Sequence, residues 1–287
     1  MTKYKLVILM EKILRLFRKN WIGSVGGLIV LLLIITAILA PLLTPYSPTE
    51  MNVIDRNSPP TRDYIFGTDR FGRDQFTRIV YGARVSLQVG MISVGIGVLT
   101  GLFLGLLAGY YKGMLDTIIM RFMDLLLSFP AILLALVVIT VLGPDLTNTM
   151  IAIGITYIPV FTRIARGSVL SVREDEFVLA GRAIGLSDWR LISRHIMPNI
   201  LAPIIVQASL ALAGAILTEA ALSFLGLGIQ PPAPSWGAML NESRRYMELA
   251  PWTVIFPSLA IMITVISFNL FGDGLRDILD PKIQNSR

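Results

Sequence analysis

"EDEFVLAGRAIGLSDWRLISRHIMPN", residues 174–199, is a charged segment that joins two apolar runs without any charge, 146–162 and 196–218. The segment contains no recognisable nucleophile, metal-ligand cluster or phosphate-binding loop. Long apolar runs joined by short charged segments are typical of a protein that crosses a membrane several times. The pattern around this stretch therefore decides the fold class.

The composition of the whole chain agrees with that interpretation. Of its 287 residues, 54% are hydrophobic and 15% are charged, and the mean hydropathy is +0.69. An average soluble domain has roughly 25% charged residues, so we expect an all-α integral membrane protein. The net charge of +6 fits basic membrane flanks, and no basic stripe interleaved with aromatics indicates nucleic-acid binding. The absence of cysteine excludes disulfide and thiolate chemistry.

Six uncharged runs are long enough to cross a membrane, which takes roughly 20 apolar residues. They cover residues 22–43, 85–111, 125–144, 146–162, 196–218 and 249–272. Only Asp145 separates the third run from the fourth, and Gly143-Pro144-Asp145 predicts a tight hairpin there.

These runs divide the chain into five parts. We expect a cytoplasmic amphipathic leader over 1–20, a first transmembrane helix over 21–44, an extracytoplasmic or interfacial segment over 45–83, a five-helix core over 84–273 and a cytoplasmic tail over 274–287. Within the core, 174–197 is a polar segment and 229–248 is an outer loop. A solvated basic leader without a helix is the alternative for the first part.

The Lys and Arg residues predict the orientation. With both termini inside, 17 of the 25 basic residues lie inside and 8 outside. This bias favours cytoplasmic termini. The polar segment 174–197 is then cytoplasmic.

Four glycines of the second run recur at every fourth position: Gly97, Gly101, Gly105 and Gly109. Small residues at this spacing let helix backbones approach closely within lipid. We interpret the stripe as a tight helix–helix contact. A substrate path lined by bare backbone is the alternative.

Signatures of enzyme chemistry are missing from the sequence. The dipeptide Gly-Lys does not occur, so the chain has no P-loop of its own. One histidine makes a histidine-based metal site unexpected, and no cofactor is expected on this chain. Glu219 is the one acid deep in a predicted span. It is either a pathway or switch residue, or an acid near the outer interface bonded to Thr218, Ser223 or backbone.

The opening stretch predicts two short helices over 175–184 and 188–197. One apolar, mostly small face of the first helix contains Phe177, Ala180, Gly181 and Ile184. Gly185 suits the left-handed position after a helix, and Ser187 suits the start of the next one. Trp189, Ile192 and Ile196 mark one face of the second helix, which Pro198 ends before the next span. A knob of small residues at such a bend is suited to docking in a partner's groove.

Within this stretch, "LAGRAIGLSDWRLISRHIMP" resembles the EAA loop of ABC importer permeases. That signature reads E-A-A, three residues, G, nine residues and I-x-L-P. Here 179–181 is Leu-Ala-Gly at the E-A-A positions, and Gly185 and Pro198 match. His195 and Met197 stand where the signature has Ile and Leu.

Three further stretches are similar to the C-type permease of peptide/nickel-class importers. They are "FGTDRFGRDQFTRIVYGARVSL" (66–87), "RFMDLLLSFPAILLAL" (121–136) and "EAALSFLGLGIQPPAPSWGAML" (219–240). The resemblance implies a type I importer architecture in a bacterial or archaeal cytoplasmic membrane, surrounded by lipid. It also implies a second, B-type permease subunit, two ABC ATPase subunits that use ATP and Mg, and an extracytoplasmic solute-binding protein.

The resemblance also implies roles for particular residues. Coupling helices within 174–197 would dock on the ATPases through Phe177, Ala180, Gly181, Arg182, Ala183, Gly185 and Pro198. Glu219 and Trp236 are candidates for the substrate path or gate. For Trp236 an interfacial aromatic belt is the alternative. Short peptides are the favoured substrate, with nickel chelates, glutathione or oligosaccharides as alternatives; a stand-alone secondary transporter would usually show more spans and repeats.

Overall fold

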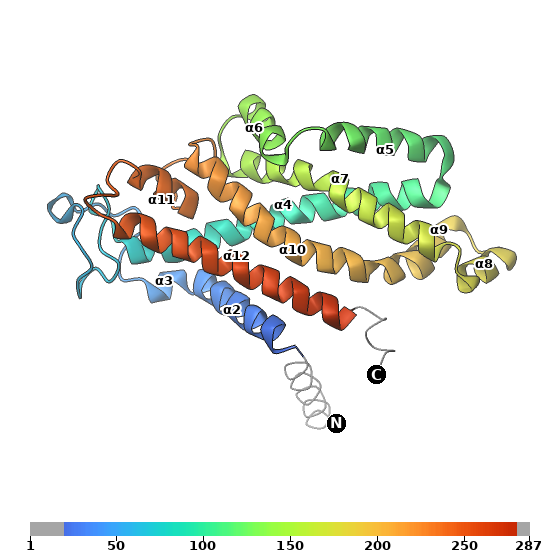
Figure 1. Ribbon diagram of the computed structural model, residues 1–287, viewed down its shortest axis with the longest axis horizontal. Coiled ribbons are helices and arrows are strands. Elements are labelled where there is room, and N and C mark those ends of the chain that lie inside the picture. The colour runs from blue at the N-terminus through green and yellow to red at the C-terminus, as the bar shows by residue number, and fades with distance from the viewer. Residues whose placement is uncertain (1–19, 280–287) are drawn as a thin grey trace, which may run out of the picture.

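The computed structural model describes residues 20–279, and the elements of this part are helices (Figure 1). Five segments are long and apolar enough to cross a membrane. They are α2 (Trp21–Ile38), α4 (Gln75–Tyr111), α7 (Leu146–Val172), α10 (Met197–Phe224) together with the short helices before it, and α12 (Trp252–Leu279). This confirms the predicted all-α membrane fold.

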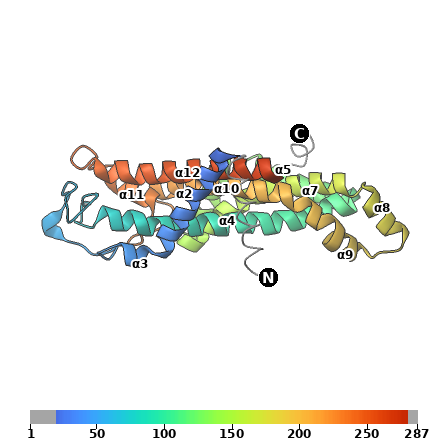
Figure 2. The ribbon, with the colours of Figure 1, turned by 90° about the horizontal axis from the view of Figure 1, so that it is seen from below.

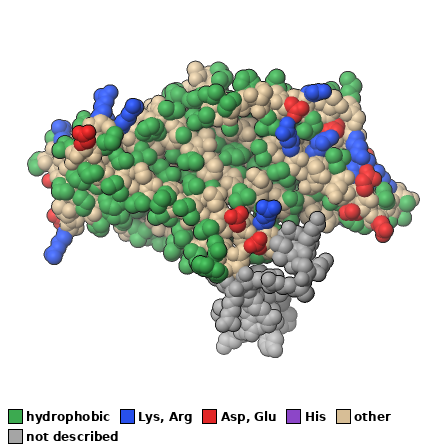
Figure 3. Space-filling view, viewed as in Figure 1, with side chains coloured by type: hydrophobic (Ala, Val, Ile, Leu, Met, Phe, Trp, Pro, Cys, Tyr) green, Lys and Arg blue, Asp and Glu red, His purple; other side chains and the backbone are tan. Residues whose placement is uncertain are grey.

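Helices α4, α7, α10 and α12 run roughly along the long axis of the molecule, and α2 crosses them obliquely (Figures 1 and 2). At one end, here named the α11 end, lie α11 (Trp236–Ser243), the four-residue α3 (Ala40–Leu43), and a segment over 44–74 that contains the turn η1 (Val53–Asp55). At the other, the α8 end, lie α8 (Glu176–Ala183) and α9 (Asp188–Leu191). Charged side chains lie in groups toward both ends and beside the last part of α12, with a largely hydrophobic band between (Figure 3).

The two ends of the described chain lie together. The side-chain amide of Asn20, which caps α2, donates to Asp277 of α12 at 2.6 Å. Helices α2 and α12 therefore start and finish on one side, as an even number of crossings requires. The predicted leader and most of the predicted tail lie outside the described residues, and residues 274–279 belong to α12 rather than to a tail.

The third predicted span, 125–144, is not a single helix. Helix α5 (Gly113–Leu127) and helix α6 (Ala131–Leu142) meet at an angle of 92°. Pro130 at the break has no N–H and disfavours a helical conformation for the residue before it. If the bent pair counts as one crossing, the total is the predicted six.

The search for charge-free runs placed the third span wrongly, because α5 contains two acidic residues that pair with arginines of α7. Arg166 of α7 holds Asp116 with two hydrogen bonds of 2.5 and 2.7 Å, and Arg163 donates to Asp124 at 2.7 Å. Helix α4 likewise begins at Gln75, ten residues before its uncharged run. The Asp74 carboxylate caps it by accepting from the Thr77 N–H at 2.8 Å. The hairpin between α6 and α7 is where the sequence predicts it, and Asp145 caps α7.

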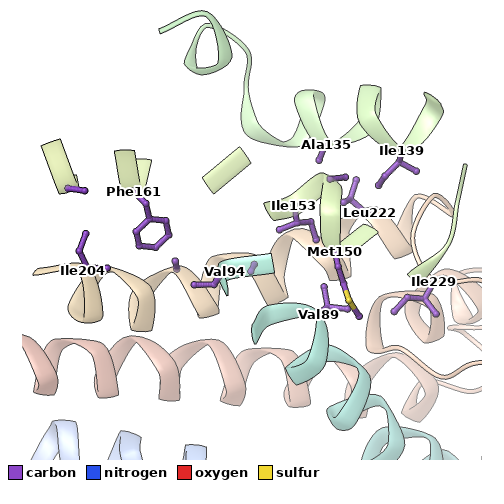
Figure 4. Close-up of a cluster of buried hydrophobic side chains, with 14 residues drawn as sticks. Val89, Val94, Ala135, Ile139, Met150, Ile153, Phe161, Ile204, Leu222 and Ile229 are labelled. Atoms are coloured by element: carbon purple, nitrogen blue, oxygen red, sulfur yellow. The ribbon is translucent and has the colours of Figure 1, made fainter. Parts of the chain in front are cut away.

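One cluster of buried hydrophobic side chains lies between α4, α6, α7 and α10 (Figure 4), and a second lies between α2, α4, α10, α11 and α12. Ile139, Ile153, Phe161 and Leu222 contribute fully buried side chains from three of these helices.

The glycine stripe of α4 lies directly against α7. A Cβ atom at Gly97, Gly101, Gly105 or Gly109 would lie 2.5–2.8 Å from the Cβ of Tyr157, Phe161, Ala165 or Val169, respectively. Both series repeat every four residues, so the two helices are in contact along one continuous line. Side chains of α7 fill the space beside these glycines, which leaves no room there for the substrate path that was the alternative interpretation.

Candidate functional site

Helices α8 and α9 form a bend at the end of the molecule (Figure 1). Gly185 has φ +79°, and the Leu186 N–H donates to the Gly181 carbonyl at 3.1 Å. With the bond from Gly185 N–H to the Arg182 carbonyl at 2.9 Å, this is the glycine-terminated helix end that the sequence predicts.

The second helix does not end at Pro198. Helix α9 continues into a π-helical turn over Ile192–Ile196 and then into α10 without a break. Pro198 lies in the first turn of α10, where a missing N–H is tolerated. Because the chain stays helical from 188 to 224, movement of α9 passes directly into α10.

The face predicted for α8 is divided between the interior and the surface. Gly181 is buried, and a Cβ there would lie 2.8 Å from Leu191 Cδ2. Phe177, Ala180, Arg182 and Ala183 are exposed. Val178, three residues before Gly181, lies in the same buried cluster as Leu191. Gly181 and Val178 therefore form the face of α8 that packs against α9.

The sequence assigned two residues of the bend to apolar helix faces without indicating that they would be its most exposed apolar residues. Ile184 and Trp189 flank Gly185, and each is 78% exposed. Trp189 was expected to share a face with Ile192 and Ile196, but only those two are buried. Large apolar side chains that are exposed on a surface outside the membrane core are candidates for a partner contact.

Polar contacts join the loop to the last turn of α4. The Tyr110 hydroxyl donates to Asp188 at 2.5 Å, and Arg173 donates to the Tyr110 carbonyl at 2.7 Å and the Gly109 carbonyl at 3.2 Å. The Arg182 guanidinium lies 5.3 Å from the centroid of the Tyr110 ring. We name the contacts of Tyr110, Arg173, Arg182 and Asp188 the Tyr110 clamp.

Replacing Gly185 with valine tests the backbone requirement of the bend. No atom lies within 4 Å of a Cβ at Gly185, so the cost comes from the left-handed conformation, which β-branched residues rarely adopt. We expect the free energy of unfolding to fall by about 1–2 kcal/mol. If the bend is the ATPase contact that the resemblance implies, we also expect weaker ATPase binding by the purified protein. Gly185→Asn is the matched control, because asparagine tolerates this conformation. Equal binding by both variants and the wild type would contradict the assignment.

Glu219 is fully buried between α4 and α10. Its carboxylate accepts from Ser223 at 2.8 Å and from Ser86 of α4 at 3.3 Å. Of the two partners named from the sequence, Ser223 is present, whereas Thr218 donates to the Gly214 carbonyl. Glu219 therefore joins two helices through hydroxyl groups.

Trp236 is 1% exposed and begins α11. Its indole N–H donates to the Ile79 carbonyl of α4 at 3.0 Å, and its ring covers Gly82. An aromatic-belt residue would instead face the lipid–water interface, so this alternative is wrong. Trp236 fastens α11 to α4.

Four charged residues at the α11 end form a buried group that the sequence did not reveal. Asp69 accepts from Arg73 Nε at 2.5 Å, and both Arg73 and Arg78 lie against Glu242 of α11, Arg78 at 3.6 Å. Arg73 and Arg78 are 2% and 1% exposed. We name Asp69, Arg73, Arg78 and Glu242 the outer charge cluster. Local spacing could predict only the Asp69–Arg73 pair, since Glu242 is 169 residues from Arg73.

Residues 101–285 match the family described as binding-protein-dependent transport system inner membrane component. The chain belongs to this permease family. Residues 9–60 also match the N-terminal TM domain of oligopeptide transport permease C.

Curated relatives cover almost the whole permease. It is 52% identical to the dipeptide transport system permease protein DppC of Alkalihalophilus pseudofirmus, over 93% of this chain and 88% of the relative. It is 47% identical to the glutathione transport system permease protein GsiD of Pectobacterium atrosepticum, over 94% and 90%. Identity to the di/tripeptide transport system permease protein DppC of Pseudomonas aeruginosa is 44%, over 92% and 89%.

A solved structure supports the fold. The permease is similar to a chain in an inward-facing structure of the MetNI methionine ABC transporter, with a TM-score of 0.56 and 17% identity. The match covers 71% of this chain and 96% of that one. The permease therefore has the type I importer fold. Its family and its relatives make it a multi-pass protein of the cytoplasmic membrane. It is a transport subunit rather than an enzyme, and it works with ATPase and other partner subunits.

Proposed function

We propose that this permease moves di- and oligopeptides from a solute-binding protein across the cytoplasmic membrane by alternating access. It pairs with a B-type permease and takes its energy from two ABC ATPase subunits, which bind the ATP and Mg. The names of two relatives support this substrate class, since one is a dipeptide and the other a di/tripeptide transport permease.

The observation that carries the proposal is the bend at the α8 end. It presents Ile184 and Trp189 to a partner, and α9 is continuous with α10. When the ATPases close on ATP, the bend moves with them and tilts α10. A packed helix pair has discrete arrangements rather than a continuous range, so a small shift at the bend is transmitted across the membrane.

Substrate class is tested in proteoliposomes that contain both permeases and the ATPases, with the solute-binding protein outside. We expect ATP-dependent uptake of a labelled dipeptide, and competition by other short peptides. Uptake of glutathione but not of the dipeptide would favour a glutathione importer, the alternative that the GsiD relative supports. Uptake of the dipeptide without ATPases would contradict an ATP-driven importer.

Replacing both Ile184 and Trp189 with glutamate tests the docking surface. Both side chains are exposed when the permease has no partner bound, so the substitutions should not disturb its folding. Burial of a bulky apolar side chain contributes about 1.5–3 kcal/mol, and a buried unpaired charge costs more. We expect the ATPases to be lost during co-purification. Leu249→Glu, at a residue 67% exposed at the α11 end, is the control and should retain them.

A further inference from the structure

Helix α4 reaches both ends of the molecule. It has 37 residues, which at 1.5 Å per residue is about 55 Å, whereas the hydrocarbon core of a bilayer is about 30 Å thick. The helix therefore projects beyond the membrane core. Each projecting end makes contacts with an element that is distant in the sequence.

At the α8 end, the Tyr110 clamp fastens α4 to the docking loop. No covalent connection does this, because α4 leads into α5 and the loop joins α7 to α10. The 2.5 Å bond from the Tyr110 hydroxyl to Asp188 reaches the first residue of α9. Arg173 is the C-cap residue of α7, and it donates to the Gly109 and Tyr110 carbonyls near the end of α4.

At the α11 end, the outer charge cluster fastens α4 to α11. Arg78 belongs to α4 and Arg73 lies two residues before its first residue, whereas Glu242 belongs to α11. The two arginines and the carboxylates of Asp69 and Glu242 balance in charge. A buried charge that loses its partner is strongly unfavourable, so α11 stays with the start of α4 when either one moves.

Between these ends, α4 has little freedom to bend or slide. The four glycines bring its backbone against α7 along one line, and closely packed interiors transmit displacement rather than absorb it. A push on Tyr110 therefore moves α4 together with α7 as one unit.

We propose that α4 carries the movement of the docking loop to α11. Tyr110, Asp188 and Arg173 are positioning residues at one end, and Arg73, Arg78 and Glu242 are positioning residues at the other. The inference rests on the proposed function, and it adds a second route to the one through α9 and α10. Helix α10 alone is the competing route, because Gly237 of α11 packs on Ala220 of α10.

The test uses the complete complex of both permeases, ATPases and binding protein in proteoliposomes. The readout is the factor by which substrate-loaded binding protein stimulates ATP hydrolysis. This factor is a ratio, so a smaller amount of folded complex leaves it unchanged. Tyr110→Phe removes only the hydroxyl, and Glu242→Gln removes the charge but keeps an acceptor oxygen. We expect each to reduce the stimulation about five- to tenfold.

The double variant decides the question. Independent distant sites have effects that combine, so two separate defects would multiply. If both substitutions interrupt one transmitting helix, the double variant should instead show the same stimulation of ATP hydrolysis as the more impaired of the two single variants. Trp236→Phe, which removes the bond to Ile79, replaces Glu242→Gln if that complex does not assemble.

Tyr111→Phe is the matched control, since Tyr111 is adjacent and 52% exposed; it should behave as the wild type. Normal stimulation in Tyr110→Phe, or multiplied defects in the double variant, would overturn the role of α4. A wild-type complex without any stimulation would instead overturn the proposed function, and this inference with it.

Discussion

Replacing Gly101 with leucine is expected to separate α4 from α7 and to prevent the permease from reaching a stable fold. A Cβ at this position would lie 2.5 Å from Phe161 Cβ and 2.9 Å from both the Ile158 carbonyl oxygen and the Thr162 nitrogen. Two of these atoms belong to the backbone of α7 and have no rotamer to change. Overpacking costs about 1–3 kcal/mol and occasionally more, and we expect at least the upper value.

Gly95→Leu gives the matched comparison within the same helix. Nothing lies within 4 Å of a Cβ at Gly95, and leucine is a better helix former than glycine. Thermal unfolding in detergent should therefore show a much lower midpoint for Gly101→Leu and an unchanged or higher one for Gly95→Leu. Similar midpoints for the two variants would mean that the glycine stripe does not hold α4 on α7.

The second large effect is expected from Asp69→Ala. Asp69 accepts from Arg73 Nε at 2.5 Å and from the Phe71 and Arg73 N–H groups at 2.8 and 3.0 Å. Without it, two buried arginines share one carboxylate, that of Glu242. Removing one partner of a buried ion pair costs about 3–5 kcal/mol, so the 44–74 segment and α11 should loosen.

Limited proteolysis measures this loosening, since cleavage within 44–74 should become faster in Asp69→Ala. Asp63→Ala is the control, because Asp63 is an exposed acid of the same segment. If both variants are cleaved like the wild type, the outer charge cluster is not what holds the segment.

Local chemistry made several features predictable. Gly185 was expected in a left-handed conformation because it follows an apolar helical face, and it has φ +79°. The stripe from Gly97 to Gly109 was expected at a helix contact because its spacing of four matches one helix face. The hairpin at Gly143-Pro144-Asp145 followed from turn chemistry alone.

Features that depend on distant partners were not predictable. Asp116 and Asp124 lie within α5 because Arg166 and Arg163 of α7 neutralise them, so a search for uncharged runs misses this helix. The π-turn over Ile192–Ile196 has no local signal in the sequence. The exposure of Trp189, beside the buried Ile192 and Ile196, was not predicted either. Glu242 could be paired with Arg73 only once the fold was known.

Cross-linking from a single cysteine at Ser187 shows whether the α8–α9 bend contacts the ATPase. The chain contains no cysteine, so Ser187→Cys places one nearly isosteric thiol between Gly185 and Trp189. With a short photoreactive maleimide on this thiol, we expect a covalent permease–ATPase adduct. Ser47→Cys, an exposed serine at the α11 end, should give none. An assembled, ATP-hydrolysing complex that yields no adduct from Ser187→Cys, or yields it from Ser47→Cys instead, would contradict the account.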